Sequence, residues 1–191
     1  MAKHTTAPAN HFYPIPDNIS LEAAALIEPL AVSWHAVNVS PFKCNDNILV
    51  VGGGPIGIGI VQVLKIQGAK NIVISEMMES RKQLATHYGA TYVLDPSVDD
   101  IPNRVHKITG GVGADVIFDT AGVEVALNAA IKACRAHGSL VNIAVWEKSP
   151  SIHVNSLMYR EARYMGATLY DEQSFVDVIR ALQYGESIAV L

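Results

Sequence analysis

Short runs of Val, Ile and Leu alternate along this chain with longer segments whose apolar residues recur at helical spacing. Several runs show no polar alternation, as is typical of strands that are covered on both faces. Because a helical segment follows most of the runs, the pattern predicts an α/β fold with a doubly wound, six-stranded parallel sheet and helices on both faces. The predicted strands are Ile48–Val51, Asn71–Ile74, Tyr92–Leu94, Val116–Asp119, Leu140–Ala144 and Arg163–Leu169.

Helices are predicted where apolar residues recur every three or four positions. Between Val123 and His137, for example, Leu127, Ile131 and Cys134 fall on one helical face. Four of the predicted helices stop just before a glycine, which favours the left-handed conformation that ends many helices. The predicted helices between and after the strands are Pro55–Gln67, Glu79–Tyr88, Ile101–Ile108, Val123–His137 and Ser174–Tyr184.

The first forty-four residues follow a different pattern. Three prolines between residues 8 and 16 indicate an extended lead-in. Ser20 can cap a helix that carries apolar residues as far as Ile27. Pro29 and Pro41 are expected to mark the bounds of a second helix, which contains Trp34. The segment is apolar but belongs to no strand–helix–strand unit, so it must pack on another surface.

Composition and charge exclude several classes of protein. Half of the residues are hydrophobic and 17% are charged, which is the balance of a globular protein. A net charge of -4 without a basic run makes nucleic acid an unexpected partner. The uncharged stretch 48–64 is interrupted at residues 52–55, so no membrane span is expected. Cys44 and Cys134 lack metal-ligand spacing, and we expect both to be buried in a protein of the reducing cytoplasm.

The most informative string is a G-x-G-x-x-G motif between a predicted strand and a predicted helix. Gly52 permits the tight turn, Gly54 lets the backbone approach a pyrophosphate, and Gly57 lets the helix pack closely on the strand. Pro55 suits the first helical turn, where its missing N–H is not needed. The free N–H groups and the helix dipole attract an anion, so we expect phosphate contacts along the backbone from Gly53 to Ile56.

An acidic residue follows the second predicted strand. Glu76 lies nineteen positions after Gly57, the place from which a carboxylate hydrogen-bonds adenosine ribose hydroxyls. We expect Glu76 and Met77 to contact the cofactor, and we expect NAD rather than NADP because a carboxylate repels a 2′-phosphate. Arg81 could recruit that phosphate, stack on adenine or pair with an acid. A solvated surface charge is the alternative interpretation of Glu76.

Two later strand ends point to the same edge of the predicted sheet. In doubly wound folds the ligand crevice lies at the carboxyl ends of the strands, so these loops are expected to flank the nicotinamide. Asp119 and Thr120 could instead, or in addition, cap the following helix. The residues expected beside the nicotinamide are Thr120, Ala121, Gly122, Ile143, Ala144 and Val145.

Beyond these motifs, the chain resembles the zinc-dependent medium-chain dehydrogenases. The resemblance rests first on Ala25–Val37, with its Glu-Pro-Leu and Trp-His-Ala strings, and on Asp46–Gly57. These strings are most similar to the butanediol and sorbitol dehydrogenase branch. The resemblance continues through Glu76, Arg81, Gly111–Asp115, Asp119–Gly122 and Glu161–Gly166.

The resemblance implies an NAD(H)-binding Rossmann domain at residues 45–191, preceded by a lead-in and interdomain helices at residues 1–44. It also implies an oxidoreductase that transfers hydride between a small secondary alcohol or vicinal diol and nicotinamide. Members of the family are dimers or tetramers that pair sheet edges. We therefore expect a homo-oligomer formed along Arg163–Leu169.

In this family a catalytic zinc polarises the alcohol oxygen. The family position that matches Glu28 is a zinc ligand or the partner of the zinc-bound water, although Glu28 could also be a first-turn helix carboxylate. The family's N-terminal barrel-like domain has no counterpart here, and the family sequence continues where Ser187–Leu191 ends. We therefore expect a truncated chain that binds NADH but is catalytically incomplete, with most zinc ligands absent.

Two further hypotheses remain open on sequence alone. The chain could be a noncatalytic NAD(H)-sensing or partner-binding module that uses an uncovered apolar surface formed by Leu26, Ile27, Leu30 and Trp34. It could also be a Rossmann-like methyltransferase, in which an acid after the second strand likewise meets a ribose. The nucleoside cofactor of a methyltransferase has no pyrophosphate, so the intact glycine spacing disfavours that hypothesis.

Overall fold

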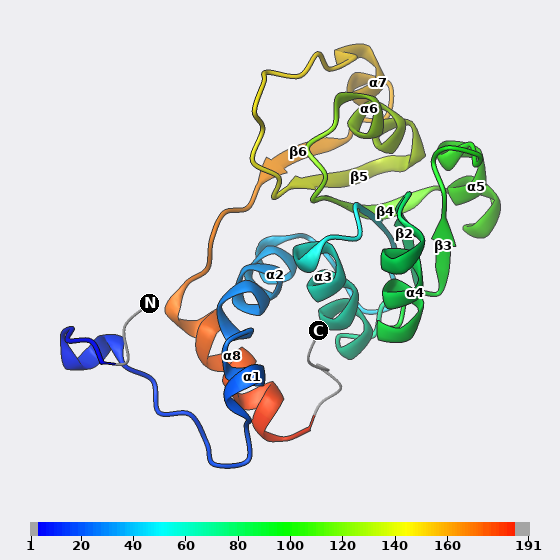
Figure 1. The fold of residues 1–191 in the computed structure, drawn as a ribbon. Helices are drawn as coiled ribbons and strands as arrows, with labels where there is room; N and C mark the ends of the chain where they lie inside the picture. Colours follow the sequence, from blue (N-terminus) through cyan, green and yellow to red (C-terminus); the bar gives the residue numbers. More distant parts are fainter. Residues whose placement is uncertain (1–3, 186–191) are drawn as a thin grey trace.

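A computed structural model describes residues 4–185 as a six-stranded sheet with helices on both faces (Figure 1). Residues 1–3 and 186–191 lie outside this description, and so does the expectation for Ser187–Leu191. The strands are all parallel, in the order β3-β2-β1-β4-β5-β6. The predicted doubly wound α/β fold is therefore confirmed, and the order in which successive strands join the sheet reverses between β1 and β4.

The elements alternate along the chain as the hydrophobic pattern predicts. The strands are β1 Asn47–Val51, β2 Asn71–Ser75, β3 Tyr92–Leu94, β4 Ala114–Asp119, β5 Cys134–Asn142 and β6 Arg163–Gly166. The helices within the sheet region are α3 Pro55–Ile66, α4 Glu79–Tyr88, α5 Ile101–Ile108, α6 Glu124–Ala133 and α7 Val154–Met158. The remaining elements are η1 Ala9–His11, α1 Leu21–Ala24, α2 Ile27–Val39 and α8 Glu172–Gln183.

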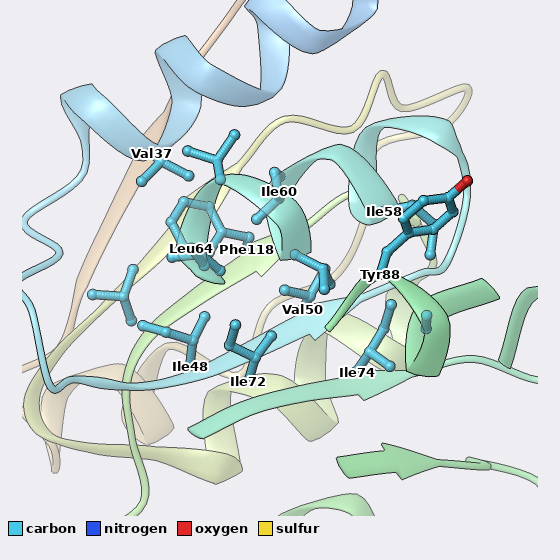
Figure 2. Close-up of a cluster of buried hydrophobic side chains, with 14 of the residues drawn as sticks. Val37, Ile48, Val50, Ile58, Ile60, Leu64, Ile72, Ile74, Tyr88 and Phe118 are labelled. Carbon is cyan, nitrogen blue, oxygen red and sulfur yellow. The ribbon is translucent and has the colours of Figure 1, made fainter. Parts of the chain in front are cut away.

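Two layers of apolar side chains lie on opposite faces of the sheet. Along β1, Ile48 and Val50 point into the layer beneath α3 and α4, which Figure 2 shows in close-up. Leu49 and Val51 point into the layer beneath α5 and α6. Because successive strand residues alternate between two buried faces, the central strands need no polar positions.

The path from α6 into β5 differs from the prediction. We predicted one helix through His137, but α6 ends at Ala133 and Cys134 already has extended backbone angles. Cys134 pairs with Ala114 in β4, and the register then shifts before the regular pairing of Ser139 with Val116. An apolar side chain such as Cys134 is buried equally well by either element, so periodicity could not locate this boundary.

The predicted ends of the last two strands are also too late. β5 ends at Asn142 rather than Ala144, and β6 ends at Gly166 rather than Leu169. Leu169 adopts a positive φ of 51°, which is incompatible with a strand. The apolar residues beyond each strand therefore belong to loops.

The lead-in also departs from its prediction. Ser20 accepts a hydrogen bond from the Ala23 N–H at 3.1 Å, so the predicted cap of α1 is confirmed. The predicted helix with Trp34 is α2, which ends before Pro41 as expected. It begins two residues before Pro29, which lies in the first turn, where a missing N–H breaks no helical hydrogen bond. Ile27 consequently belongs to α2 rather than to α1.

Helix α2 lies between α3 and α8. Ile27 and Leu30 are 1% and 3% exposed in a third apolar cluster that α2 shares with α1 and α8. Leu26 and Trp34 are partly buried against the same cluster. The uncovered apolar surface that we considered for a partner-binding module is therefore absent from these residues.

A serine and a glycine bring α2 and α3 close together. The Ser33 hydroxyl donates to the Ile56 carbonyl in the first turn of α3 at 3.0 Å and lies 3.3 Å from the Pro29 carbonyl oxygen. A Cβ at Gly59 would overlap the Ser33 hydroxyl. The contact fixes where α3 begins relative to α2.

The two cysteines have different surroundings. Cys134 is buried as expected, and burial raises the pKa of its thiol to about 11. Cys44 is exposed in the turn before β1, where its thiol lies 3.4 Å from the Gly68 carbonyl oxygen, so the expectation of burial was wrong for Cys44.

A buried polar side chain in α3 gives a test of the packing. Gln62 is fully buried, and neither its amide oxygen nor its amide nitrogen has a partner within residues 4–185. Gln62→Met should therefore raise the free energy of unfolding by about 1–2 kcal/mol, because an unsatisfied buried polar group is removed without much change in volume. Urea denaturation measures the effect.

The matched control is Gln83→Met on the exposed face of α4, which should change stability by less than about 0.5 kcal/mol. A Gln62→Met protein that is less stable than the parent would show that the amide is satisfied in solution.

Candidate functional site

The turn from β1 into α3 is built around glycines. Gly52 has a φ of 96°, a region that side chains disfavour. A Cβ at Gly57 would overlap the Gly52 carbonyl oxygen and would lie 3.1 Å from the Thr120 hydroxyl. These two positions require glycine because the first turn of α3 lies against the end of β1.

Gly54 has a different environment. A Cβ at Gly54 would meet no atom within 4 Å, so the surface of the turn is open at this residue. Gly54 precedes the first turn of the twelve-residue α3, and Pro55 has no N–H. Within the described residues, the N–H groups of Gly54 and Ile56 make no hydrogen bond. The turn therefore presents free donors at the positive end of a helix dipole.

Glu76 is tied to this turn from the neighbouring strand. One carboxylate oxygen accepts from the Gly53 N–H at 2.7 Å. The other oxygen accepts from the Met77 and Met78 N–H groups at 2.7 and 2.8 Å. The residue is only 7% exposed, so it is not the solvated surface charge of the alternative interpretation.

The hydrogen bonds decide the protonation of Glu76. Burial alone would favour the neutral acid, but the three backbone N–H groups and the Arg81 guanidinium, 3.8 Å away, hold the pKa of Glu76 below its ordinary value. The carboxylate is therefore charged at neutral pH. The side chains of Arg81 and Met77 are exposed to solvent beside the buried Glu76 carboxylate.

Thr120 joins the end of β4 to the glycine turn. Its N–H donates to the Val51 carbonyl at 3.0 Å, and its hydroxyl lies 2.8 Å from the same oxygen and 3.2 Å from the Gly52 carbonyl oxygen. Helix α6 begins at Glu124, and no side chain caps it. The hypothesis that Asp119 or Thr120 caps this helix was therefore wrong.

The loops after β4 and β5 lie against each other. A Cβ at Gly122 would be 3.2 Å from the Ala144 Cβ and 3.5 Å from the Val145 carbonyl oxygen. Beside this contact is an open pocket of about 490 Å³, lined by Ala121–Glu124 and Val145–Pro150. Ile143 takes part through its backbone, since its N–H donates to the Asp119 carbonyl at 2.9 Å.

The structure thus brings together most of the residues that the sequence singled out. Hydrogen bonds join Glu76 and Thr120 to the glycine turn through Gly53 and Gly52, and the two predicted nicotinamide-side loops lie against each other after β4 and β5. Sequence reasoning missed the Met78 N–H and the part of the pocket formed by residues 146–150. The Trp146 indole, which donates to the Asn142 side chain at 2.8 Å, gave no motif by which it could be found.

Glu28 stands apart from any metal-ligand set. It is exposed in the first turn of α2 and makes no hydrogen bond or ion pair in the described part of the chain. Between residues 4 and 185, no three His, Cys, Asp or Glu side chains are grouped closely enough to hold a metal ion. The described residues therefore do not fit a zinc site.

Within residues 4–185, no helix is both long and apolar enough to cross a membrane.

Comparison with known proteins identifies the family. Residues 55–184 match the family described as zinc-binding dehydrogenase. The chain belongs to the zinc-binding dehydrogenase family. The match confirms the resemblance drawn from the sequence and contradicts the methyltransferase hypothesis.

Curated members of the zinc-binding dehydrogenase family match nearly the whole chain. A probable diacetyl reductase [(R)-acetoin forming] 2 of Saccharomyces cerevisiae is 38% identical over 96% of this chain and 45% of its own length. An (R,R)-butanediol dehydrogenase of Neisseria gonorrhoeae is 40% identical over 83% of this chain and 45% of its own length. The chain thus spans about half the length of these relatives.

A solved structure has the same fold. The 2R,3R-butanediol dehydrogenase of Bacillus subtilis superposes with a TM-score of 0.86 and 36% identity, over 92% of this chain and 50% of that one. The Rossmann-type arrangement of this chain is therefore also found in a butanediol dehydrogenase.

The pH dependence of stability tests the state of Glu76. Its pKa in the folded protein lies below the ordinary 4.5, so the charged carboxylate stabilises the fold above that pH, and the contribution is lost as the pH falls through the folded pKa. Glu76→Gln should lower the free energy of unfolding by about 1–3 kcal/mol at neutral pH. The difference from the parent should shrink in acid, as urea denaturation at several pH values would measure.

Glu147→Gln is the control, because Glu147 is exposed and has no polar partner within residues 4–185. A Glu76→Gln difference that stays constant across the acid range would contradict a depressed pKa.

Proposed function

We propose that this chain binds NAD(H) at the glycine turn and forms the cofactor-binding part of an alcohol or polyol dehydrogenase. The observation that carries the proposal is the combination of an open backbone at Gly54 with a buried, charged Glu76 one strand away. The first fits the pyrophosphate of a dinucleotide, and the second fits its adenosine ribose. Both lie at the carboxyl ends of neighbouring parallel strands.

The pyrophosphate would be held by main-chain donors. The free N–H groups of Gly54 and Ile56 and the positive end of α3 favour a doubly charged group at this point. Gly54 has no side chain that would keep the phosphate oxygens away. Gly53 is already engaged, since its N–H donates to Glu76, so its role is to link the phosphate turn to the ribose acid.

Glu76 supports the choice of NAD over NADP. Its two oxygens accept from three backbone N–H groups, and a carboxylate oxygen has lone pairs for more than one donor, so ribose hydroxyls can still bind. A 2′-phosphate would meet a buried negative charge. The Arg81 guanidinium lies within ion-pair distance of that charge and is thereby partly neutralised as a phosphate ligand.

The nicotinamide half would lie over the loops after β4 and β5. The supporting observation is the pocket beside Gly122 and Val145, at the carboxyl ends of the central strands. When bound there, NAD supplies the hydride acceptor of the reaction. In this chain, Thr120–Gly122 and Ile143–Val145 would orient the ring and exclude water from one of its faces.

The substrate that we propose is a small secondary alcohol or vicinal diol, or the corresponding ketone. The names of the relatives support this class, since they include a butanediol dehydrogenase and a diacetyl reductase. The described residues supply no zinc site.

We also propose that two copies associate along β6. This strand is at the edge of the sheet, and Tyr164 is 39% exposed there. An edge strand with unpaired backbone groups favours pairing with a second chain.

We propose that the protein works in the reducing cytoplasm. The free state of both cysteines supports this location.

Gly54→Ala separates cofactor binding from folding. The glycine has an ordinary φ of -71° and open space around it, so a methyl group should leave stability unchanged or raise it by up to about 1 kcal/mol. The methyl group would occupy the approach of the pyrophosphate and should weaken NADH binding at least about tenfold. Fluorescence titration with NADH measures the affinity.

The matched control is Gly166→Ala, which adds the same methyl group in equally open space on β6. Gly166→Ala should bind NADH like the parent chain. Equal binding by Gly54→Ala would place the phosphate elsewhere, and no NADH binding by the parent chain would overturn the proposed function.

Light scattering tests the association. We expect a mass of at least twice the 20.5 kDa of one chain at micromolar concentration. A mass of one chain would contradict pairing along β6, and it would leave the proposed cofactor site unaffected.

A further inference from the structure

Asp119 occupies the point where the strand order reverses. It is the last residue of β4, and its Cα pairs with Val51 of β1 on one side and with Asn142 of β5 on the other. Asp119 is only 1% exposed, which is unusual for an acidic residue. The sequence suggested a helix cap here, but α6 begins at Glu124 without a side-chain cap.

The hydrogen bonds of Asp119 instead reach both loops of the pocket. One carboxylate oxygen accepts from the Ala121 N–H at 3.0 Å and from the Gly122 N–H at 3.2 Å. The main-chain carbonyl of Asp119 accepts from the Ile143 N–H at 2.9 Å and the Ala144 N–H at 3.1 Å. A single residue therefore holds the loop after β4 with its side chain and the loop after β5 with its backbone.

The second carboxylate oxygen of Asp119 is buried and has no partner within residues 4–185. Burial raises the pKa of the carboxyl, although the Ala121 and Gly122 N–H groups favour the charged form. A buried acid with one unsatisfied oxygen lowers the stability of the fold. The carboxylate is nevertheless the acceptor that holds the Ala121 and Gly122 N–H groups in place.

Glu76 and Asp119 lie on either side of β1, at the carboxyl ends of β2 and β4. Glu76 follows β2 and binds the backbone of the glycine turn, on the adenosine side. Asp119 ends β4 and binds the loops that meet at Gly122 and Ala144. In the described chain, the glycine turn is joined to the loop after β4 by Thr120, which contacts the Val51 and Gly52 carbonyl oxygens.

We propose that Asp119 is a positioning residue for the nicotinamide half of the cofactor, acting through the Ala121–Gly122 and Ile143–Ala144 backbone. The proposal rests on the proposed function and adds that the two acids affect the binding of different halves of the cofactor. Glu76 sets the affinity for the adenosine and pyrophosphate half, whereas Asp119 sets the additional affinity that the nicotinamide contributes. Asp119 itself touches neither half.

The test compares NADH with ADP-ribose, which lacks only the nicotinamide, by calorimetry on the 191-residue chain. Asp119→Ala removes the acceptor of two N–H groups and should weaken NADH binding by about tenfold while leaving ADP-ribose binding unchanged within about twofold. Asp119→Asn keeps an acceptor oxygen of the same shape and should restore NADH binding to near the parent value. Glu76→Gln should weaken both ligands alike.

A purely structural role of Asp119 predicts a different result, because partial unfolding weakens both ligands equally. Equal weakening of NADH and ADP-ribose in Asp119→Ala, or no weakening of either, would overturn the inference. Equal affinity of the parent chain for the two ligands would overturn it as well, since the loops would then contribute nothing. If the parent chain bound neither ligand, the proposed function itself would fail.

A second variant covers the case in which Asp119→Ala does not fold. Gly122 has a φ of 63°, and a Cβ there would press on the Ala144 Cβ at 3.2 Å. Gly122→Ala should therefore displace the same loop contact and weaken NADH selectively, with ADP-ribose binding as the proof of folding. Unchanged NADH binding by a folded Gly122→Ala protein would overturn the inference.

Discussion

The close approach of α3 to the end of β1 is the constraint on which the rest of the site depends. Gly57 lies so near the Gly52 carbonyl oxygen that no side chain fits between them. The Thr120 hydroxyl fills the adjoining space and lies within hydrogen-bond distance of both Val51 and Gly52. Because the helix begins this close to the strand, its unpaired N–H groups point out from the edge of the sheet rather than into the core.

That constraint also explains why an acid can be buried beside the turn. A charged carboxylate needs several donors when it loses water, and Glu76 finds them in the backbone of Gly53, Met77 and Met78. The arrangement works in both directions, since the acid orders the turn and the turn keeps the acid charged. Burial raises the pKa of Asp119, and its side chain has only two such donors to favour the charged form.

The sequence predicted those parts of the site that depend on local chemistry. The glycine turn and Glu76 could be located because their spacing follows from one strand, one helix and one crossover. The end of α6, the place of Pro29 within α2 and the exposure of Cys44 could not, because each depends on what packs there. The role of Asp119 was hidden for the same reason. Its partners in the loop after β5 are more than twenty residues away along the chain.

The path of contacts through α2 extends the support of the site beyond the sheet. Helix α8 covers α2, and α2 holds the first turn of α3 through Ser33 and Ile56. The free N–H groups at the start of α3 are thus supported indirectly by α8, which packs on the far side of α2. A substitution that loosens α8 would therefore also loosen the first turn of α3, although α8 packs on α2 rather than on the glycine turn.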